Sequence, residues 1–262
     1  MEKRPLILVT NDDGITAPGI RWLVRTMAAI GDVVVVAPDS PQSGKGHAIT
    51  IDNTLYAQLF KGAPEDGALV EYSCSGTPAD CVKLALHELM DRKPDLVVSG
   101  INHGSNSSIN VIYSGTMSAA IEAGLEGIPA IGFSLCDFSW DADFNSAAHY
   151  AGVLAQEALN QGIPNGVVLN VNIPRTHEIK GVRICRQARA NWKEKFDKRK
   201  SPMGKEYYWL TGVFDLQDSG SDTDEWALAE GYVSVVPVHF DLTAHHAISH
   251  INKEWDWSKL GD

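Results

Sequence analysis

The sequence alternates short, uninterrupted apolar runs with stretches of helical periodicity, and this alternation limits the fold more than any other feature. The first run covers residues 6–10 (LILVT), and the second covers residues 32–38 (DVVVVAP). Between them, apolar residues from Ile20 to Ile30 recur at the spacing of one helix face. A continuous apolar run is typical of a strand that is buried on both faces, so the order strand, helix, strand predicts a parallel sheet.

The same alternation continues to about residue 185. Further apolar runs predict four more strands, at residues 69–74, 94–100, 129–135 and 166–174. Helical patterns separate them, at residues 77–91, 116–127 and 145–161. The chain is therefore expected to form a doubly wound α/β core over about residues 5–185.

Beyond this core the pattern changes. Residues 186–205 carry eight Lys or Arg and show little periodicity, which predicts an exposed loop or arm that could cover an anionic substrate. Residues 206–214 and 231–243 have the composition of strands, and the second leads into a short amphipathic tail at residues 244–262.

Composition excludes several classes of function. The formal net charge of −11 disfavours a nucleic-acid polymer as a partner, because phosphate backbones are bound by basic surfaces. No window approaches the ~20 apolar residues of a membrane span. The first ten residues carry a basic pair but only about five apolar residues, too few for a signal peptide. The four cysteines have no CxxC spacing, which is typical of free thiols in a reducing compartment. We expect a cytoplasmic protein without a membrane partner.

Polar residues follow three of the predicted strands. Asp12 and Asp13 come directly after the first strand, Ser43 follows the second, and Asn102 follows the strand at residues 94–100. Parallel strands end at the same edge of a sheet, so these side chains should meet there. An all-oxygen set suits Mg²⁺ or Mn²⁺. The alternative is that the Asp pair only caps a turn, since Asp-Asp-Gly is a common turn sequence.

A second candidate lies at residues 113–116 (YSGT), where a predicted helix begins. Hydroxyl groups and free backbone N–H groups at a helix N-terminus can hold an anion such as phosphate. The alternative is an ordinary Ser or Thr N-cap. For His47, a hydrogen-bonding role is favoured over a catalytic one.

Six segments together resemble the SurE (survival protein E) nucleotidase family. They occur in the order of that family between residues 6 and 243: ILVTNDDGI, VVAPDSPQSGKGHAIT, SGTPADCV, PDLVVSGINHGSN, NVIYSGTMSAA and GYVSVVPVHFDLT. The resemblance implies a metal-dependent phosphomonoesterase, a 5′-nucleotidase that hydrolyses nucleoside 5′- and 3′-monophosphates. Some members of the family also degrade short polyphosphate. Val236 stands where the family commonly has Thr, which bears on substrate preference rather than on reaction class.

The resemblance also implies roles for particular residues. The family's metal ligands correspond here to Asp12, Asp13, Ser43 and Asn102, and the metal would be one Mg²⁺ or Mn²⁺ ion. The two aspartates would also be catalytic, one of them orienting or deprotonating the attacking water. The phosphate-binding positions of the family correspond to Asn106, Ser114, Gly115 and Thr116.

The fold of the family is a Rossmann-like three-layer α/β/α core with a mostly parallel sheet, a β-hairpin extension and a C-terminal arm. The resemblance thus implies one domain over residues 1–262, with the core at about 5–185, the basic loop or hairpin extension at 186–230, and the final strand and arm at 231–262. In the family the arm is exchanged within a homodimer or homotetramer.

Two other classes of protein also place aspartates after a first strand. A phosphoaspartyl-type phosphatase uses one of them as nucleophile, but its two aspartates are two residues apart, whereas Asp12 and Asp13 are adjacent. A non-catalytic Mg-binding receiver-like signalling module is about half as long and needs an acceptor Asp after a later strand. Residues 99–102 (Ser-Gly-Ile-Asn) contain no Asp at that point.

Overall fold

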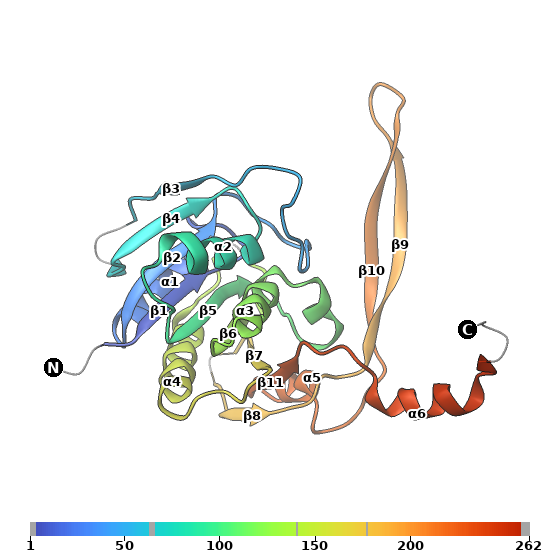
Figure 1. The fold of residues 1–262 in the computed structure, drawn as a ribbon. Coiled ribbons are helices and arrows are strands. Elements are labelled where there is room, and N and C mark those ends of the chain that lie inside the picture. Colours follow the sequence, from blue (N-terminus) through green and yellow to red (C-terminus); the bar gives the residue numbers. More distant parts are fainter. Residues whose placement is uncertain (1–3, 63–65, 140, 177, 258–262) are drawn as a thin grey trace.

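The computed structural model describes residues 4–62, 66–139, 141–176 and 178–257. In this part of the chain, nine strands form one sheet in the order β3-β4-β2-β1-β5-β6-β7-β11-β8, and two more form a separate hairpin (Figure 1). Neighbouring strands from β4 to β7 run parallel, whereas β3 and β11 pair antiparallel to their neighbours β4 and β7. The predicted α/β class with a mostly parallel sheet is confirmed.

The parallel strands lie close to the predicted apolar runs. Their bounds are β1 (Leu6–Thr10), β2 (Asp32–Pro38), β4 (Val70–Cys74), β5 (Leu96–His103), β6 (Ala130–Leu135) and β7 (Val167–Ile173). Strand β5 extends three residues beyond the predicted end, as far as His103. The two edge strands, β3 (Ala57–Leu59) and β8 (Val182–Ile184), were not predicted. The strand expected at 231–243 is β11 (Val233–His239), which lies between β7 and β8.

Helices cover both faces of the sheet. Their bounds are α1 (Pro18–Ala28), α2 (Pro78–Leu84), α3 (Gly115–Leu125), α4 (Asn145–Gln161), α5 (Asp224–Ala229) and α6 (His245–Glu254). Helix α2 continues into a π-helical turn, η2 (Ala85–Leu89), and a short 3₁₀ helix, η3 (Ser108–Tyr113), precedes α3. Helices α1 and α4 bury their apolar faces in one core, and α2 and α3 bury theirs in the other. The sheet therefore lies between two helical layers.

The strand order reverses between β1 and β5. From β1 the chain proceeds outward to β2 and β4, whereas β5 is followed by β6 and β7 on the other side. A crevice forms beyond the carboxyl ends of the strands at such a reversal, and ligands of open α/β sheets bind there. The polar loops that follow β1 and β5 flank this point. The fold therefore brings the loop of the Asp pair beside the loop of Asn102.

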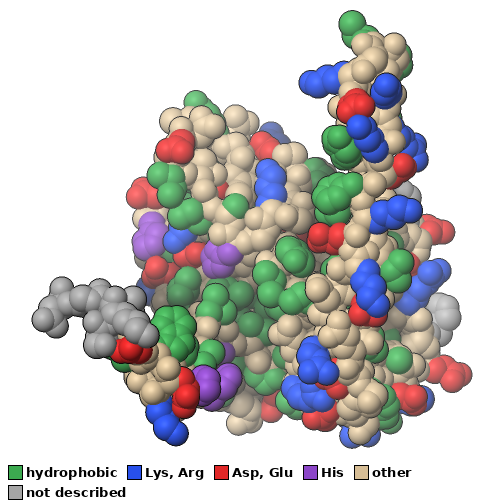
Figure 2. All heavy atoms as spheres, turned by 90° about the vertical axis from the view of Figure 1, so that its right-hand side faces the viewer, with side chains coloured by type: hydrophobic (Ala, Val, Ile, Leu, Met, Phe, Trp, Pro, Cys, Tyr) green, Lys and Arg blue, Asp and Glu red, His purple; other side chains and the backbone are tan. Residues whose placement is uncertain are grey.

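The hairpin β9 (Ala190–Lys200) and β10 (Glu206–Leu216) corrects one prediction and confirms another. Residues 190–200 were expected to lack regular structure, but they pair in register with β10 from Ala190–Leu216 to Lys200–Glu206. Most side chains on both faces of the hairpin are exposed, so no alternation marks the strand in the sequence. The β-hairpin extension implied by the family resemblance is present, and Figure 2 shows Lys and Arg side chains along it.

The C-terminal part projects from the sheet (Figure 1). Helix α6 follows β11 and has no buried residue. The predicted amphipathic tail at 244–262 is thus helical over residues 245–254, and its last residues, 258–262, lie outside the described part of the chain. Within the described residues, no helix has the length and apolar character needed to cross a membrane.

Candidate active site

A cavity of about 300 Å³ opens beside the carboxyl ends of β1 and β5. It collects residues from the three predicted loops, from η3 and from the start of β9. Among its lining residues are Asp12, Ser43, Asn102, Asn106, Asn110, Tyr113, Ser114 and Trp192. Five of the residues named from the sequence thus share one cavity.

Asp12 is held by the N-terminus of α3. Its side chain is buried, and its Oδ1 accepts a hydrogen bond of 2.6 Å from Thr116 Oγ1. A Cβ atom on Gly115 would lie 2.7 Å from Asp12 Cβ, so only glycine allows this approach. Gly115 and Thr116, which were predicted to bind phosphate, are therefore packed against Asp12, and the Thr116 side chain is fully buried. Their role toward phosphate stays a prediction.

Asp13 faces a neighbouring cavity of about 380 Å³ rather than the first one. Its Oδ2 accepts a hydrogen bond of 3.1 Å from the His103 backbone N–H. His103 and Phe138 line both cavities and so lie between them. Asp12 and Asp13 are adjacent in the chain and line two cavities that meet at His103 and Phe138.

Burial makes the charge of the Asp pair unfavourable. It raises the pKa of Asp12 to about 6, with a further contribution from the Asp13 carboxylate and opposition from the Thr116 hydrogen bond. Burial also raises the pKa of Asp13, against the hydrogen bond from His103. A cation bound beside the two carboxylates would favour their ionised forms and offset this cost of burial.

Ser43 and Asn102 supply uncharged oxygens to the same cavity. The loop of Ser43 is tied to the site because the Gln42 N–H donates to the Asp12 carbonyl oxygen at 2.7 Å. Asn102 uses its amide nitrogen within its own loop, where Nδ2 donates to the Gly104 carbonyl oxygen at 2.8 Å. Its Oδ1 accepts no hydrogen bond from any residue within the described ranges, and it is therefore available as a ligand.

This donor set fits a hard divalent cation. Two carboxylates, a hydroxyl and an amide oxygen are the ligand types that Mg²⁺ and Mn²⁺ take, with water completing the shell. Among the described residues, no group of three or more His, Cys, Asp or Glu side chains could hold a metal. The predicted set is consistent with this result, because only Asp12 and Asp13 belong to those types.

Asn106 and Ser114 line the cavity on the side of β6 and α3. The Asn106 backbone N–H donates to Asn172 Oδ1 at 2.8 Å, and its Nδ2 donates to Ser134 Oγ at 2.8 Å. One Nδ2 hydrogen of Asn106 remains for a ligand, since a carboxamide nitrogen carries two. Ser114 is the N-cap of α3, and its Oγ accepts from the Met117 N–H at 3.0 Å. The alternative of an ordinary N-cap therefore holds for its side chain.

Sequence reasoning missed the supports of Asn106. Asn170 Nδ2 donates to the Asn106 carbonyl oxygen at 2.8 Å, and Asn172 Nδ2 donates to Asn170 Oδ1 at 3.1 Å. Both asparagines are buried on β7. Two buried asparagines two residues apart in an apolar strand share one face. That spacing was a usable signal in the sequence.

His47 has a structural partner. Its Nε2 lies 2.8 Å from Glu122 Oε2, and Lys83 Nζ lies 2.5 Å from Glu122 Oε1. Glu122 is buried on α3. The hydrogen-bonding role favoured for His47 from the sequence agrees with this contact, which links the loop of Ser43 to α3.

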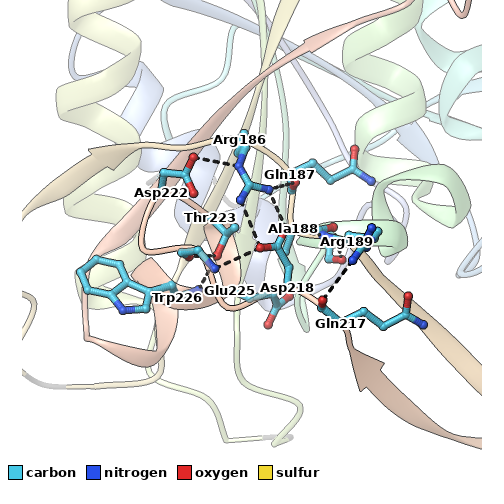
Figure 3. A network of polar contacts seen from close by, with 12 residues as sticks. Arg186, Gln187, Ala188, Arg189, Gln217, Asp218, Asp222, Thr223, Glu225 and Trp226 are labelled. Carbon is cyan, nitrogen blue, oxygen red and sulfur yellow. Dashed lines mark hydrogen bonds and ion pairs between the residues drawn. The ribbon is translucent and has the colours of Figure 1, made fainter. Parts of the chain in front are cut away.

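A network of polar contacts lies at the base of the hairpin (Figure 3). On its exposed side, Arg186 binds Asp218 at 2.6 Å and Asp222 at 2.8 Å. On its buried side, Asp224 accepts from the Ala188 N–H at 2.9 Å and from the Ser108 N–H at 2.7 Å. Asp224 thus joins the hairpin to the loop that carries Asn106.

We expect Asp224→Asn to lower the free energy of unfolding by about 2 kcal/mol, because one carboxylate oxygen becomes an NH₂ group facing a buried backbone donor. Asp222→Asn is the matched control: its side chain is 67% exposed and it binds Arg186 at the surface, so the expected change is within about 0.5 kcal/mol. Urea unfolding of both variants measures the difference. Equal stabilities would contradict a bridging role for Asp224.

Comparison with known proteins assigns the family. The family model described as "Survival protein SurE" matches residues 7–194. The chain belongs to the SurE family. A protein named 5′-nucleotidase SurE from Flavobacterium psychrophilum is 66% identical over 98% of this chain and 99% of its own length. Another of that name from Bacteroides fragilis is 49% identical over 97% and 98%.

The fold agrees with a solved SurE structure. The crystal structure of the SurE protein from Aquifex aeolicus has a TM-score of 0.80 and 40% sequence identity, covering 95% of this chain and 98% of that one. The residues matched by the SurE family model include every candidate site residue, from Asp12 to Thr116.

Proposed function

We propose that the chain is a divalent-metal-dependent 5′-nucleotidase, a phosphomonoesterase that releases phosphate from nucleoside 5′-monophosphates. The main support is the buried Asp12, which lies beside Asp13 at the strand-order reversal and faces a cavity shared with Ser43, Asn102 and Asn106. Near full-length relatives named 5′-nucleotidase SurE support the same substrate class.

Asp12, Asp13, Ser43 and Asn102 would hold one Mg²⁺ or Mn²⁺ ion. When bound, the cation would neutralise phosphate charge and lower the pKa of a nearby water. The chain's own groups bind and orient the substrate. Asp12 or Asp13 accepts the proton of the attacking water, whichever keeps a free carboxylate oxygen.

The phosphate faces the N-terminus of α3 and the loop of Asn106. The free Nδ2 hydrogen of Asn106 and the backbone N–H groups of Gly115 and Thr116 donate to its equatorial oxygens, which carry charge during in-line displacement. The Ser114 N–H already donates to the Val111 carbonyl oxygen. The positive end of the α3 dipole adds to this stabilisation. These donors are fixed before substrate binds, because Asn106 is held by Asn172 and Ser134.

The test is phosphate release from a panel of 5′- and 3′-nucleoside monophosphates and a short polyphosphate, with and without EDTA. We expect release from 5′- and 3′-monophosphates that EDTA abolishes, with exopolyphosphatase activity as a side reaction. A trapped covalent aspartyl phosphate would favour the phosphoaspartyl mechanism. Complete absence of phosphate release would favour the receiver-like signalling module.

Thr116→Val should lower kcat/KM about ten-fold, because the hydroxyl that orients the Asp12 carboxylate is lost while the side-chain volume is kept. Thr26→Val is the matched control, since the Thr26 hydroxyl donates to the Trp22 carbonyl oxygen within α1 and touches no site residue. Kinetics with one 5′-monophosphate measure both. An unchanged kcat/KM in Thr116→Val would show that the Thr116 hydroxyl is not needed to orient Asp12.

We further propose that residues 1–262 act as one domain, with the hairpin and the C-terminal arm as extensions of the core. The exposed α6 and the exposed apolar side chains of the hairpin support assembly into a homodimer or homotetramer. Sedimentation velocity of the full chain tests this assembly. The free thiols of all four cysteines support a cytoplasmic location.

A further inference from the structure

A groove of about 370 Å³ lies between the hairpin and η3, outside the cavity that holds Asp12. Tyr113 and Trp192 line it together with Gly44, Glu194, Leu210 and Thr211. Tyr113, Trp192 and Gly44 also line the catalytic cavity, so the two spaces meet at these residues. A ligand whose phosphate lies near Asn106 can therefore extend into the groove.

The two aromatic side chains of the groove are exposed but not equally free. Trp192 Nε1 donates to Asn110 Oδ1 at 2.9 Å, and the indole packs edge-on against Phe214 with ring centroids 5.4 Å apart. Its ring is thereby fixed although 38% of the residue is exposed. Tyr113, 51% exposed, ends η3 directly before the N-cap of α3. The Trp192 ring is thus presented to a ligand in a position set by the surrounding structure, and the exposed Tyr113 lines the same groove.

The groove favours a flat, uncharged ring over an extended anion. An aromatic side chain can stack on any of the nucleobases, because every base has a π-face. The Glu194 carboxylate at the same groove can only accept hydrogen bonds, so it suits N–H groups on a base edge and repels a further phosphate. Gly44 has no atom within 4 Å of where a Cβ would lie, which leaves the junction with the cavity open for a sugar.

We propose that Tyr113 and Trp192 form the nucleobase subsite of this enzyme, in which the base stacks while the phosphate lies in the cavity of Asp12. This proposal rests on the proposed nucleotidase function. It assigns substrate selection to a residue of the hairpin, because Trp192 belongs to β9. Compounds with the same phosphate and ribose but no base would lack this contact.

The test compares adenosine 5′-monophosphate with ribose 5-phosphate. Trp192→Ala should raise KM for the nucleotide about ten-fold or more, as expected for loss of one stacking contact, and should affect ribose 5-phosphate much less. Trp192→Phe should keep most of the preference for the nucleotide, since it retains an aromatic face. Trp209→Ala is the matched control, because Trp209 is an exposed tryptophan of the same hairpin outside the groove and should change neither substrate.

Equal losses with both substrates in Trp192→Ala would assign Trp192 a structural role and overturn the subsite. An unchanged KM for the nucleotide would do the same. A wild-type protein that releases no phosphate from either compound would instead refute the nucleotidase function itself. The ratio of the two kcat/KM values therefore separates failure of the subsite from failure of the proposed function.

Discussion

Asp12→Asn is expected to lower kcat for phosphate release by about 10³-fold or more while leaving the fold intact. The substitution removes the carboxylate that would serve as metal ligand and, if it is the base, as proton acceptor. An asparagine keeps the shape of the side chain, and its carbonyl oxygen can still accept the hydrogen bond from Thr116 Oγ1. The loss of activity would therefore report the lost charge rather than a lost contact.

The same variant should make the metal-free protein more stable at pH 7. Burial and Asp13 hold the pKa of Asp12 at about 6, above the ordinary 3.8, so ionising it disfavours the folded state by about 3 kcal/mol. The folded state binds the proton more tightly, so stability in EDTA falls as the pH rises from about 4 to about 6. Asp12→Asn removes that fall and should raise the free energy of unfolding by about 2 kcal/mol.

Asp32→Asn serves as the control for charge loss alone. Asp32 begins β2 at the opposite edge of the sheet, where its carboxylate lies 3.7 Å from the Arg4 guanidinium. We expect wild-type turnover and a change in unfolding free energy within about 0.5 kcal/mol. Normal turnover in Asp12→Asn would show that Asp12 takes no part in catalysis or metal binding. A lower free energy of unfolding of this variant in EDTA would contradict the prediction that the ionised Asp12 carboxylate destabilises the fold.

The alternating core and its strand-end loops were predictable because a buried strand appears in the local sequence as an apolar run. Each parallel strand is an uninterrupted apolar run, and a polar side chain directly after such a run must lie at the carboxyl edge. The positions of Asp12, Ser43 and Asn102 followed from this rule and share one cavity. The edge strands β3 and β8 could not be found in this way, since three residues are too few to show a period.

Contacts between residues far apart in the sequence have no comparable local pattern and could not be predicted. Asp224 reaches Ser108 across 116 residues, and Trp192 reaches Asn110 across 82 residues. Such contacts depend on how the hairpin docks on the core, which local periodicity does not encode. Thr116 illustrates the remaining limit. Its place at the start of a predicted helix was recognisable, but its hydrogen bond to Asp12 depends on how the N-terminus of α3 approaches the loop after β1.

Removal of divalent metal should abolish phosphate release, and Mg²⁺ or Mn²⁺ should restore it. The physical reason is the charge of the Asp pair, which the described protein groups do not neutralise: the pKa values of both carboxyls are raised rather than lowered. Binding a cation to the folded state alone should also stabilise it, by about 2.7 kcal/mol at a metal concentration one hundred times Kd. Thermal unfolding in EDTA and in each metal measures this stabilisation beside the activity.

The dependence on pH and on Asp12 makes the metal prediction specific. Metal binding requires the ionised carboxylate, so metal affinity should weaken as the pH falls through about 6, the pKa of Asp12. Asp12→Asn should show neither the stabilisation nor the activity at any metal concentration, and K⁺ at matched ionic strength should have no effect. Full activity in EDTA would contradict the metal site. Metal-dependent stabilisation that persists in Asp12→Asn would place the cation elsewhere in the molecule.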